Sequence, residues 1–155
     1  MICYRDECHR NGMKNKLPVN PLIKDNHSEQ VFIMKLSKII EYAKGEILNP
    51  SVFSDDEIVG GCGADLMSDV LTRAKPGAVL LTGLCNLQVV RTAEMADARA
   101  IVLLRGKHPT PEMVELATQK NVTLISSEMG MFELCGRLYN AGLHSFESNW
   151  NGFHE

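Results

Sequence analysis

The sequence lacks the features that mark several large classes of protein. It has one tryptophan and only 6% aromatic residues, scattered along the chain, so it offers no platform of stacked rings for single-stranded nucleic acid. Its net charge of −3 provides no general attraction for nucleic acid or for an acidic membrane. No apolar run approaches the roughly 20 residues of a membrane-spanning helix. These absences predict a chain with no nucleic-acid partner and no membrane partner.

Signatures of catalysis and of secretion are also missing. The chain contains neither Gly-x-Gly-x-x-Gly nor Gly-Lys-Ser/Thr, and no base stands in an evident relation to a nucleophile. We therefore expect no catalytic residue and no cofactor. The cysteines number five, and Cys62, Cys85 and Cys135 lie in or beside apolar segments, where a reduced thiol acts as a small hydrophobic group. This usage predicts a reducing, cytoplasmic location.

The feature that the sequence does have is a threefold repetition of strand and helix patterns. Short apolar runs at 78–81, 100–104 and 122–125 are each followed by a break and then by a stretch of helical period. Runs of this kind are typical of parallel strands that are buried on both faces. The pattern predicts an α/β fold in which a mostly parallel sheet carries helices on both faces.

The chain divides into three parts by composition. Residues 1–33 are polar and irregular, with Pro18 and Pro21 as breakers, and we interpret them as an irregular or disordered leader or a flexible arm. A helical pattern begins at Met34, and residues 34–143 form the expected α/β domain, with Gly45 as the predicted end of its first helix. Residues 144–155 have no period and are expected to form a loose tail.

Polar residues follow the predicted strands at the edge where ligands of parallel sheets collect. Thr82 and Gly83 follow the first repeated strand, and Arg105 and Gly106 follow the second. Arg91 and Thr92 lie one to two turns into the intervening helix. Arginines and free amides in one place suit a phosphate or carboxylate ligand, although exposed loop residues without a ligand would give the same pattern.

A glycine-rich segment at 60–63 precedes another predicted helix. Its free amides, including those of Gly60 and Gly61, could bind an anion, but a tight strand-to-helix turn that requires glycine is the simpler interpretation. Asp65 is predicted to cap the helix. Asp65 and Asp69 are four residues apart, so on one helix face they could hold a divalent metal, or they are a cap and a solvated surface residue.

Several strings in this region resemble stand-alone DRTGG-domain proteins. They are residues 61–71, 81–84, 90–96 and 131–138, and the resemblance spans roughly residues 34–143. It implies a fold similar to the N-terminal domain of HPr kinase/phosphorylase and a regulatory rather than catalytic role, commonly as a dimer. The chain departs from the name-giving motif, because Thr82-Gly83-Leu84 replaces Gly-Asp-Arg and Leu104-Arg105-Gly106 replaces Thr-Gly-Gly.

Three functional hypotheses follow. The first is a non-catalytic regulatory module that senses a small anionic ligand, such as a nucleotide, or docks on a partner enzyme. The second is a small metal-dependent enzyme that acts on a phosphorylated substrate through Asp65, Asp69 and Arg91. The third is an assembly adaptor without a ligand. In each case we expect a homodimer, since Met95, Met129 and Met131 suit adaptable contact surfaces.

Overall fold

The repeated apolar runs form adjacent parallel strands, as their pattern predicts. The computed structural model describes residues 33–145, so the predicted leader up to residue 32 and the tail from residue 146 lie outside the described residues. The elements, in chain order, are β1 (Met34–Lys35), α1 (Leu36–Ala43), β2 (Glu46–Ile47), a short 3-10 helix (Pro50–Val52), β3 (Glu57–Ile58), β4 (Gly61–Gly63), α2 (Met67–Arg73), β5 (Val79–Thr82), α3 (Leu87–Met95), β6 (Ala100–Leu103), α4 (Pro111–Gln119), β7 (Thr123–Ser126) and α5 (Met131–Asn140).

The main sheet has five strands in the order β2-β7-β6-β5-β4. Strands β4 to β7 are parallel, with Leu80 opposite Ile101 and Ile101 opposite Leu124, and β2 is antiparallel to β7. A separate two-stranded antiparallel pair joins β1 to β3. Because β4 to β7 follow one another in a single direction across the sheet, right-handed crossovers place α2, α3 and α4 on the same face.

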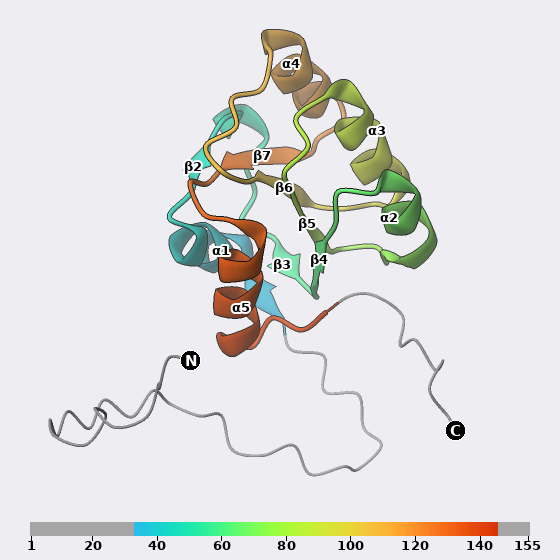
Figure 1. The fold of residues 1–155 in the computed structure, drawn as a ribbon. Helices are drawn as coiled ribbons and strands as arrows, with labels where there is room; N and C mark the ends of the chain where they lie inside the picture. Colours follow the sequence, from blue (N-terminus) through green and yellow to red (C-terminus); the bar gives the residue numbers. More distant parts are fainter. Residues whose placement is uncertain (1–32, 146–155) are drawn as a thin grey trace, which may run out of the picture.

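Helices cover both faces of the sheet, which confirms the predicted α/β fold. One core lies between the sheet and α2, α3 and α4; the opposite core lies between the sheet and α1 and α5 (Figure 1). The strand residues alternate between the two cores: Leu80 and Ile101 belong to the first, Leu81 and Val102 to the second. This alternation explains why the strands read as unbroken apolar runs in the sequence.

The N-terminus of α1 is capped by residues that lie far from it in the sequence. Its own preceding residue, Lys35, makes no side-chain cap bond. Instead Asp55 Oδ1 accepts a hydrogen bond from Ser37 N at 2.8 Å, and Leu36 N donates to Asp56 O at 2.9 Å. The hydrogen bonds that Ser37 donates lower the pKa of Asp55. The loop segment 54–56 therefore supplies acceptors for the start of α1.

The end of α1 differs from the prediction that Gly45 stops it. Lys44 takes the left-handed conformation, with φ 46°, and Gly45 N then donates to Ile40 O at 2.9 Å. Gly45 is required for another reason: an added Cβ would lie 2.6 Å from Cγ2 of Ile125 in β7. Glycine here serves the close approach of two chain segments rather than a positive φ.

The prediction that Asp65 caps α2 was wrong. α2 starts at Met67 with Leu66 as its capping position, and Leu66 and Leu71 are exposed. α5 starts at Met131, after Gly130. Ser127 Oγ donates to Ala43 O at 2.6 Å and ties α1 to the end of β7.

The segment Gly61–Gly63 is an edge strand, not a strand-to-helix turn. Gly61 N donates to His144 O at 2.9 Å, and Gly61 forms an isolated parallel bridge with Ser145. The first two residues of the predicted tail thus lie beside β4. A Cβ on Gly63 would lie 2.9 Å from Cys135 Sγ, so glycine lets α5 pack closely on this strand.

Candidate functional site

The loops that follow β4, β5, β6 and β7 meet at the carboxyl edge of the sheet. Ala64 N donates to Leu81 O at 3.0 Å, which brings the residues after β4 beside those after β5. Leu104 N donates to Thr82 O at 3.0 Å, and Ser127 N donates to Leu103 O at 2.9 Å. The parallel register therefore assembles one continuous surface from four segments that are distant in the sequence.

Asp65 is the central acceptor of this surface. Its Oδ1 accepts a hydrogen bond from Gly83 N at 2.7 Å and another from Thr82 Oγ1 at 2.9 Å. The Thr82 hydroxyl also accepts from Leu84 N at 3.1 Å, and Thr82 is fully buried. Thr82 therefore holds the loop in shape, and the carboxylate of Asp65 occupies the position in which the Gly83 amide would meet an anion.

Arg105 projects over the same place. Arg105 and Gly106 both have left-handed backbones, with φ of 60° and 61°, and their amides donate to Met129 O and Ser127 O at 3.0 Å each. These bonds fix the loop after β6 against the loop after β7. A Cβ added to Gly83 would lie 3.0 Å from Arg105 Nη1 and 3.5 Å from the Asp65 carboxylate, so glycine leaves space between the two charged groups.

A second carboxylate and a second cation complete the edge. A Cβ on Gly106 would lie 2.7 Å from Oε2 of Glu128, a residue that the sequence interpretation did not include. Lys107 lies near Cys85, since its charge opposes the rise in the Cys85 pKa that burial causes. Glu128 could have been anticipated only from its place directly after the serine pair that ends β7.

Four of the predicted ligand-binding residues come together at this edge, namely Thr82, Gly83, Arg105 and Gly106. Gly60 and Gly61 do not join them. They pair with the first residue of β5, Val79, whose amide donates to Gly60 O at 3.0 Å, so they lie at the opposite, amino edge of the sheet. Since the Gly61 amide is bonded to His144 O, it offers no donor to an anion.

The helix residues Arg91 and Thr92 are placed differently again. Thr92 is a buried residue of α3, so a ligand at the sheet edge does not reach it. At 100° per residue, Arg91 lies opposite the buried Val89, Val90 and Ala93, so it faces solvent on the outer side of α3. The arrangement centres the candidate site on Gly83 and Arg105.

Asp65 and Asp69 do not form the paired face on which the metal hypothesis depends. Asp65 precedes α2 and binds Thr82 and Gly83, whereas Asp69 is exposed in the first turn of the helix. Within residues 33–145, no three side chains of His, Cys, Asp or Glu are grouped as metal ligands.

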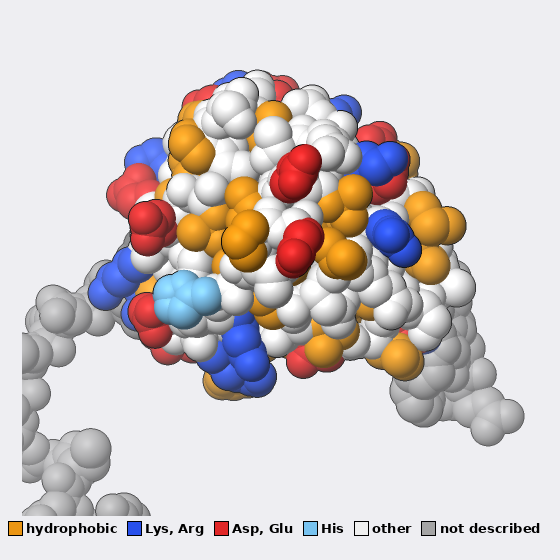
Figure 2. Space-filling model, turned by 90° about the horizontal axis from the view of Figure 1, so that it is seen from above, with side chains coloured by type: hydrophobic (Ala, Val, Ile, Leu, Met, Phe, Trp, Pro, Cys, Tyr) orange, Lys and Arg blue, Asp and Glu red, His pale blue; other side chains and the backbone are white. Residues whose placement is uncertain are grey.

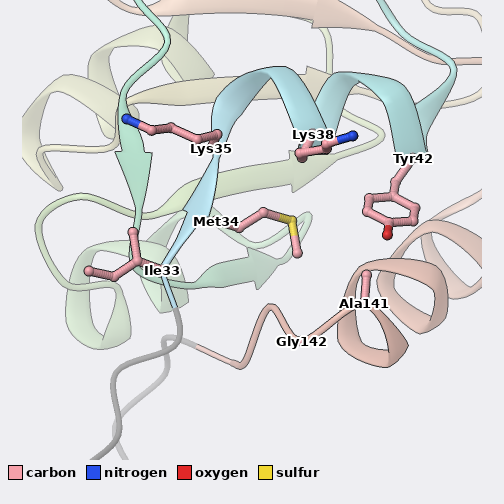
Figure 3. A pocket seen from close by; sticks show the side chains of 7 residues that line it. All are labelled: Ile33, Met34, Lys35, Lys38, Tyr42, Ala141 and Gly142. Carbon is pink, nitrogen blue, oxygen red and sulfur yellow. The ribbon is translucent and has the colours of Figure 1, made fainter. Parts of the chain in front are cut away.

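Two hollows of the surface lie away from the carboxyl edge. The larger, about 270 Å³, lies between the start of α1 and the end of α5 and is lined by Ile33, Met34, Lys35, Lys38, Tyr42, Ala141 and Gly142 (Figure 3). Met34 and Tyr42 turn toward its middle, while Lys35 and Lys38 are paired with Glu57 and Glu41. The smaller, about 190 Å³, lies between β4 and α5. Neither offers an unpaired cation.

The distribution of charge supports a local site rather than a broad one. Figure 2 shows a face on which hydrophobic and acidic side chains share the middle, while lysines and arginines are dispersed around the margin. Among the described residues, the ion pairs are Lys35–Glu57, Lys38–Glu41, Lys120–Glu94 and Arg137–Glu133, and Arg105 is in none of them. Among the residues 33–145, Arg105 is thus a cation at the carboxyl edge that forms no ion pair.

Comparison with known proteins supports the α/β fold. No family model matches the chain, and no curated protein matches its sequence. Among solved structures it is similar to the CBS and DRTGG domains of the regulatory region of Clostridium perfringens pyrophosphatase, complexed with the activator diadenosine tetraphosphate. The TM-score is 0.59 at 16% identity, over 76% of this chain and 51% of that one. The likeness shows a related fold, and this chain spans about half the length of that structure. Among the described residues, no helix is long and apolar enough to cross a membrane.

Proposed function

We propose that this protein is a non-catalytic regulatory module that senses a small anionic ligand, a nucleotide being the best fit, and that it acts as a homodimer on a partner enzyme in the cytoplasm. The observation that carries the proposal is Arg105, which projects its guanidinium over Gly83 at the carboxyl edge of the sheet and forms no ion pair with any described residue. The similar pyrophosphatase region, which binds a dinucleotide activator, supports the same role.

The mixture of charges at the edge favours a ligand with both donors and acceptors. Arg105 and Lys107 attract an anionic group, whereas Asp65 and Glu128 accept hydrogen bonds and repel a bare anion. A nucleotide carries phosphate oxygens for the cations, and ribose hydroxyls or base amines for the carboxylates. Inorganic phosphate satisfies only half of this arrangement, so we expect it to bind more weakly than a nucleotide.

The proposal is tested by ligand titration of the full chain. Thermal shift and calorimetry would compare inorganic phosphate, AMP, ATP and diadenosine tetraphosphate. Arg105→Ala should weaken nucleotide binding by roughly ten- to a hundredfold, because a charge-assisted hydrogen bond contributes about 1.5–3 kcal/mol. Arg99→Ala is the matched control, since Arg99 is an exposed arginine next to the amino end of the same strand, β6.

Two results would contradict this assignment. If Arg91→Ala weakens binding and Arg105→Ala does not, the ligand binds along α3 instead of at the sheet edge. If no nucleotide, phosphoester or carboxylate raises the melting temperature at millimolar concentration, the adaptor hypothesis replaces the sensor hypothesis.

A further inference from the structure

Helix α5 presents a hydrophobic strip to solvent that the candidate site does not use. The side chain of Phe132 is 95% exposed and that of Tyr139 is 57% exposed. Gly136 lies between them, and no atom of the described residues comes within 4 Å of the position that its Cβ would take. These residues have the spacing i, i+4 and i+7, so they share one side of the helix.

A pair of opposite charges borders this strip. Arg137 Nη2 lies 2.8 Å from Glu133 Oε1. Counting 100° per residue from the buried Leu134 and Leu138, Gly136 points most directly outward. The two aromatic residues lie on one side of it, and the two charged residues lie on the other. The outward face of α5 is thus divided lengthwise into an aromatic flank, a glycine and a charged flank.

This pattern is complementary to itself when two copies of the helix run antiparallel. In a two-fold pair each flank meets the same flank of the other helix. With the axis between Cys135 and Gly136, Phe132 faces the second copy's Tyr139, and Glu133 lies within one residue of the second copy's Arg137. Every charge then meets its opposite, and each aromatic ring meets an aromatic ring.

We propose that α5 is the self-association surface of this protein and that a second copy packs its α5 antiparallel across Gly136. The flank order selects this occupant, because a parallel two-fold pair would set the charged flank of each helix against the aromatic flank of the other. Within residues 33–145 no neighbour requires a glycine at position 136, and glycine is unfavourable in a helix interior, whereas it lets two helix axes approach closely. The proposal rests on the homodimer part of the proposed function and is independent of ligand binding.

Charge exchange tests the pairing directly. Glu133→Arg and Arg137→Glu each make the flank uniformly charged, so each variant alone should associate about tenfold or more weakly than the wild type in analytical ultracentrifugation. Mixing the two variants should restore association as a heterodimer, because each uniformly charged flank then meets its opposite. A loss of helix stability inside one chain cannot produce this restoration.

An aromatic truncation gives the second test. Phe132→Ala should weaken association by about tenfold or more, as removal of an interface anchor does. Leu87→Ala is the control, because Leu87 is an exposed residue of α3 on the other face of the sheet and should leave association unchanged. All variants should keep cooperative melting, which circular dichroism would verify.

The outcomes separate this proposal from ligand sensing. A wild-type monomer at several hundred micromolar, unchanged association in all three α5 variants, or no heterodimer on mixing would each overturn the α5 interface. Nucleotide-induced thermal shifts measured on the same samples report on the carboxyl edge alone. A weakly associating variant that still binds nucleotide would uphold the sensor, and a full dimer without any ligand response would reject the sensor only.

Discussion

The two edges of the main sheet are built from the same strands and helices but differ in what their polar groups do. At the amino edge, buried polar groups form hydrogen bonds with one another. Asn49 Oδ1 accepts from Leu124 N at 2.8 Å, and Asn49 Nδ2 donates to Val122 O at 2.9 Å. At the carboxyl edge, Asp65, Arg105 and Glu128 surround glycine backbone and remain exposed. We therefore expect the amino edge to contribute more to stability, and the carboxyl edge is where we propose that a ligand binds.

The largest expected loss of stability follows from a substitution at the amino edge. Asn49 is buried, and Asn49→Ala would leave the Leu124 amide and the Val122 carbonyl without their partner. We expect a loss of about 2–4 kcal/mol in the free energy of unfolding, since each unsatisfied buried group costs about 1–3 kcal/mol. Urea denaturation measures this loss.

The matched control for Asn49 is an asparagine at the carboxyl edge. Asn86 is exposed and its Oδ1 accepts from Val89 N at 3.2 Å as the cap of α3. Asn86→Ala should cost only about 1 kcal/mol, as is usual for a helix cap. Equal losses for the two variants would contradict the idea that the amino edge bears more of the stability.

The next effect concerns Asp65, where stability and binding should change in opposite directions. Asp65→Ala removes the acceptor of Gly83 N and Thr82 Oγ1 and should cost about 1–2 kcal/mol of stability. Asp65→Asn keeps an acceptor oxygen and should cost less. Both variants remove a negative charge beside Arg105, so we expect inorganic phosphate to bind several-fold more tightly, measured by calorimetry.

Asp69→Asn is the control for this charge, because Asp69 is exposed in α2 and was predicted to act together with Asp65. It should change neither stability nor phosphate affinity appreciably. If Asp69→Asn raises phosphate affinity as much as Asp65→Asn does, the effect is one of net charge and says nothing about the geometry of the edge.

The fold could be predicted because its signal is local. Buried parallel strands require unbroken apolar runs, and Thr110 and Asn86, which are residue types typical of N-caps, cap their helices. The site could be predicted only in part. That Thr82 and Arg105 share an edge follows from strand order, whereas the turn of Asp65 toward Gly83 depends on the register between β4 and β5. Sequence periodicity carries no information on such a register.

The glycine-rich segment is a second case in which the sequence does not reveal a contact between distant parts of the chain. Glycines before a helix usually indicate a turn, but Gly61–Gly63 is a strand. The reason lies in its neighbours: Cys135 of α5 crowds Gly63, and the Leu143 side chain lies 3.3 Å from the position of a Gly61 Cβ. Close packing against a distant helix can require glycine as strictly as a turn does, and the sequence does not distinguish the two causes.

The smallest expected changes in the free energy of unfolding concern residues with left-handed backbones at the two edges. Left-handed residues follow the helices at both edges: Lys44 (φ 46°) after α1 at the carboxyl edge and Asn121 (φ 56°) after α4 at the amino edge. Lys44→Gly should stabilise the protein by about 0.5–1 kcal/mol, because glycine adopts this conformation without strain. Asn121→Gly should change stability by only about a few tenths of a kcal/mol, since asparagine tolerates the left-handed region.

Lys38→Gly, in the interior of α1, should instead destabilise by about 1 kcal/mol. Urea titrations with an unchanged m-value would measure all three. A loss of stability in Lys44→Gly would mean that the lysine side chain stabilises the carboxyl edge by more than its backbone strain costs.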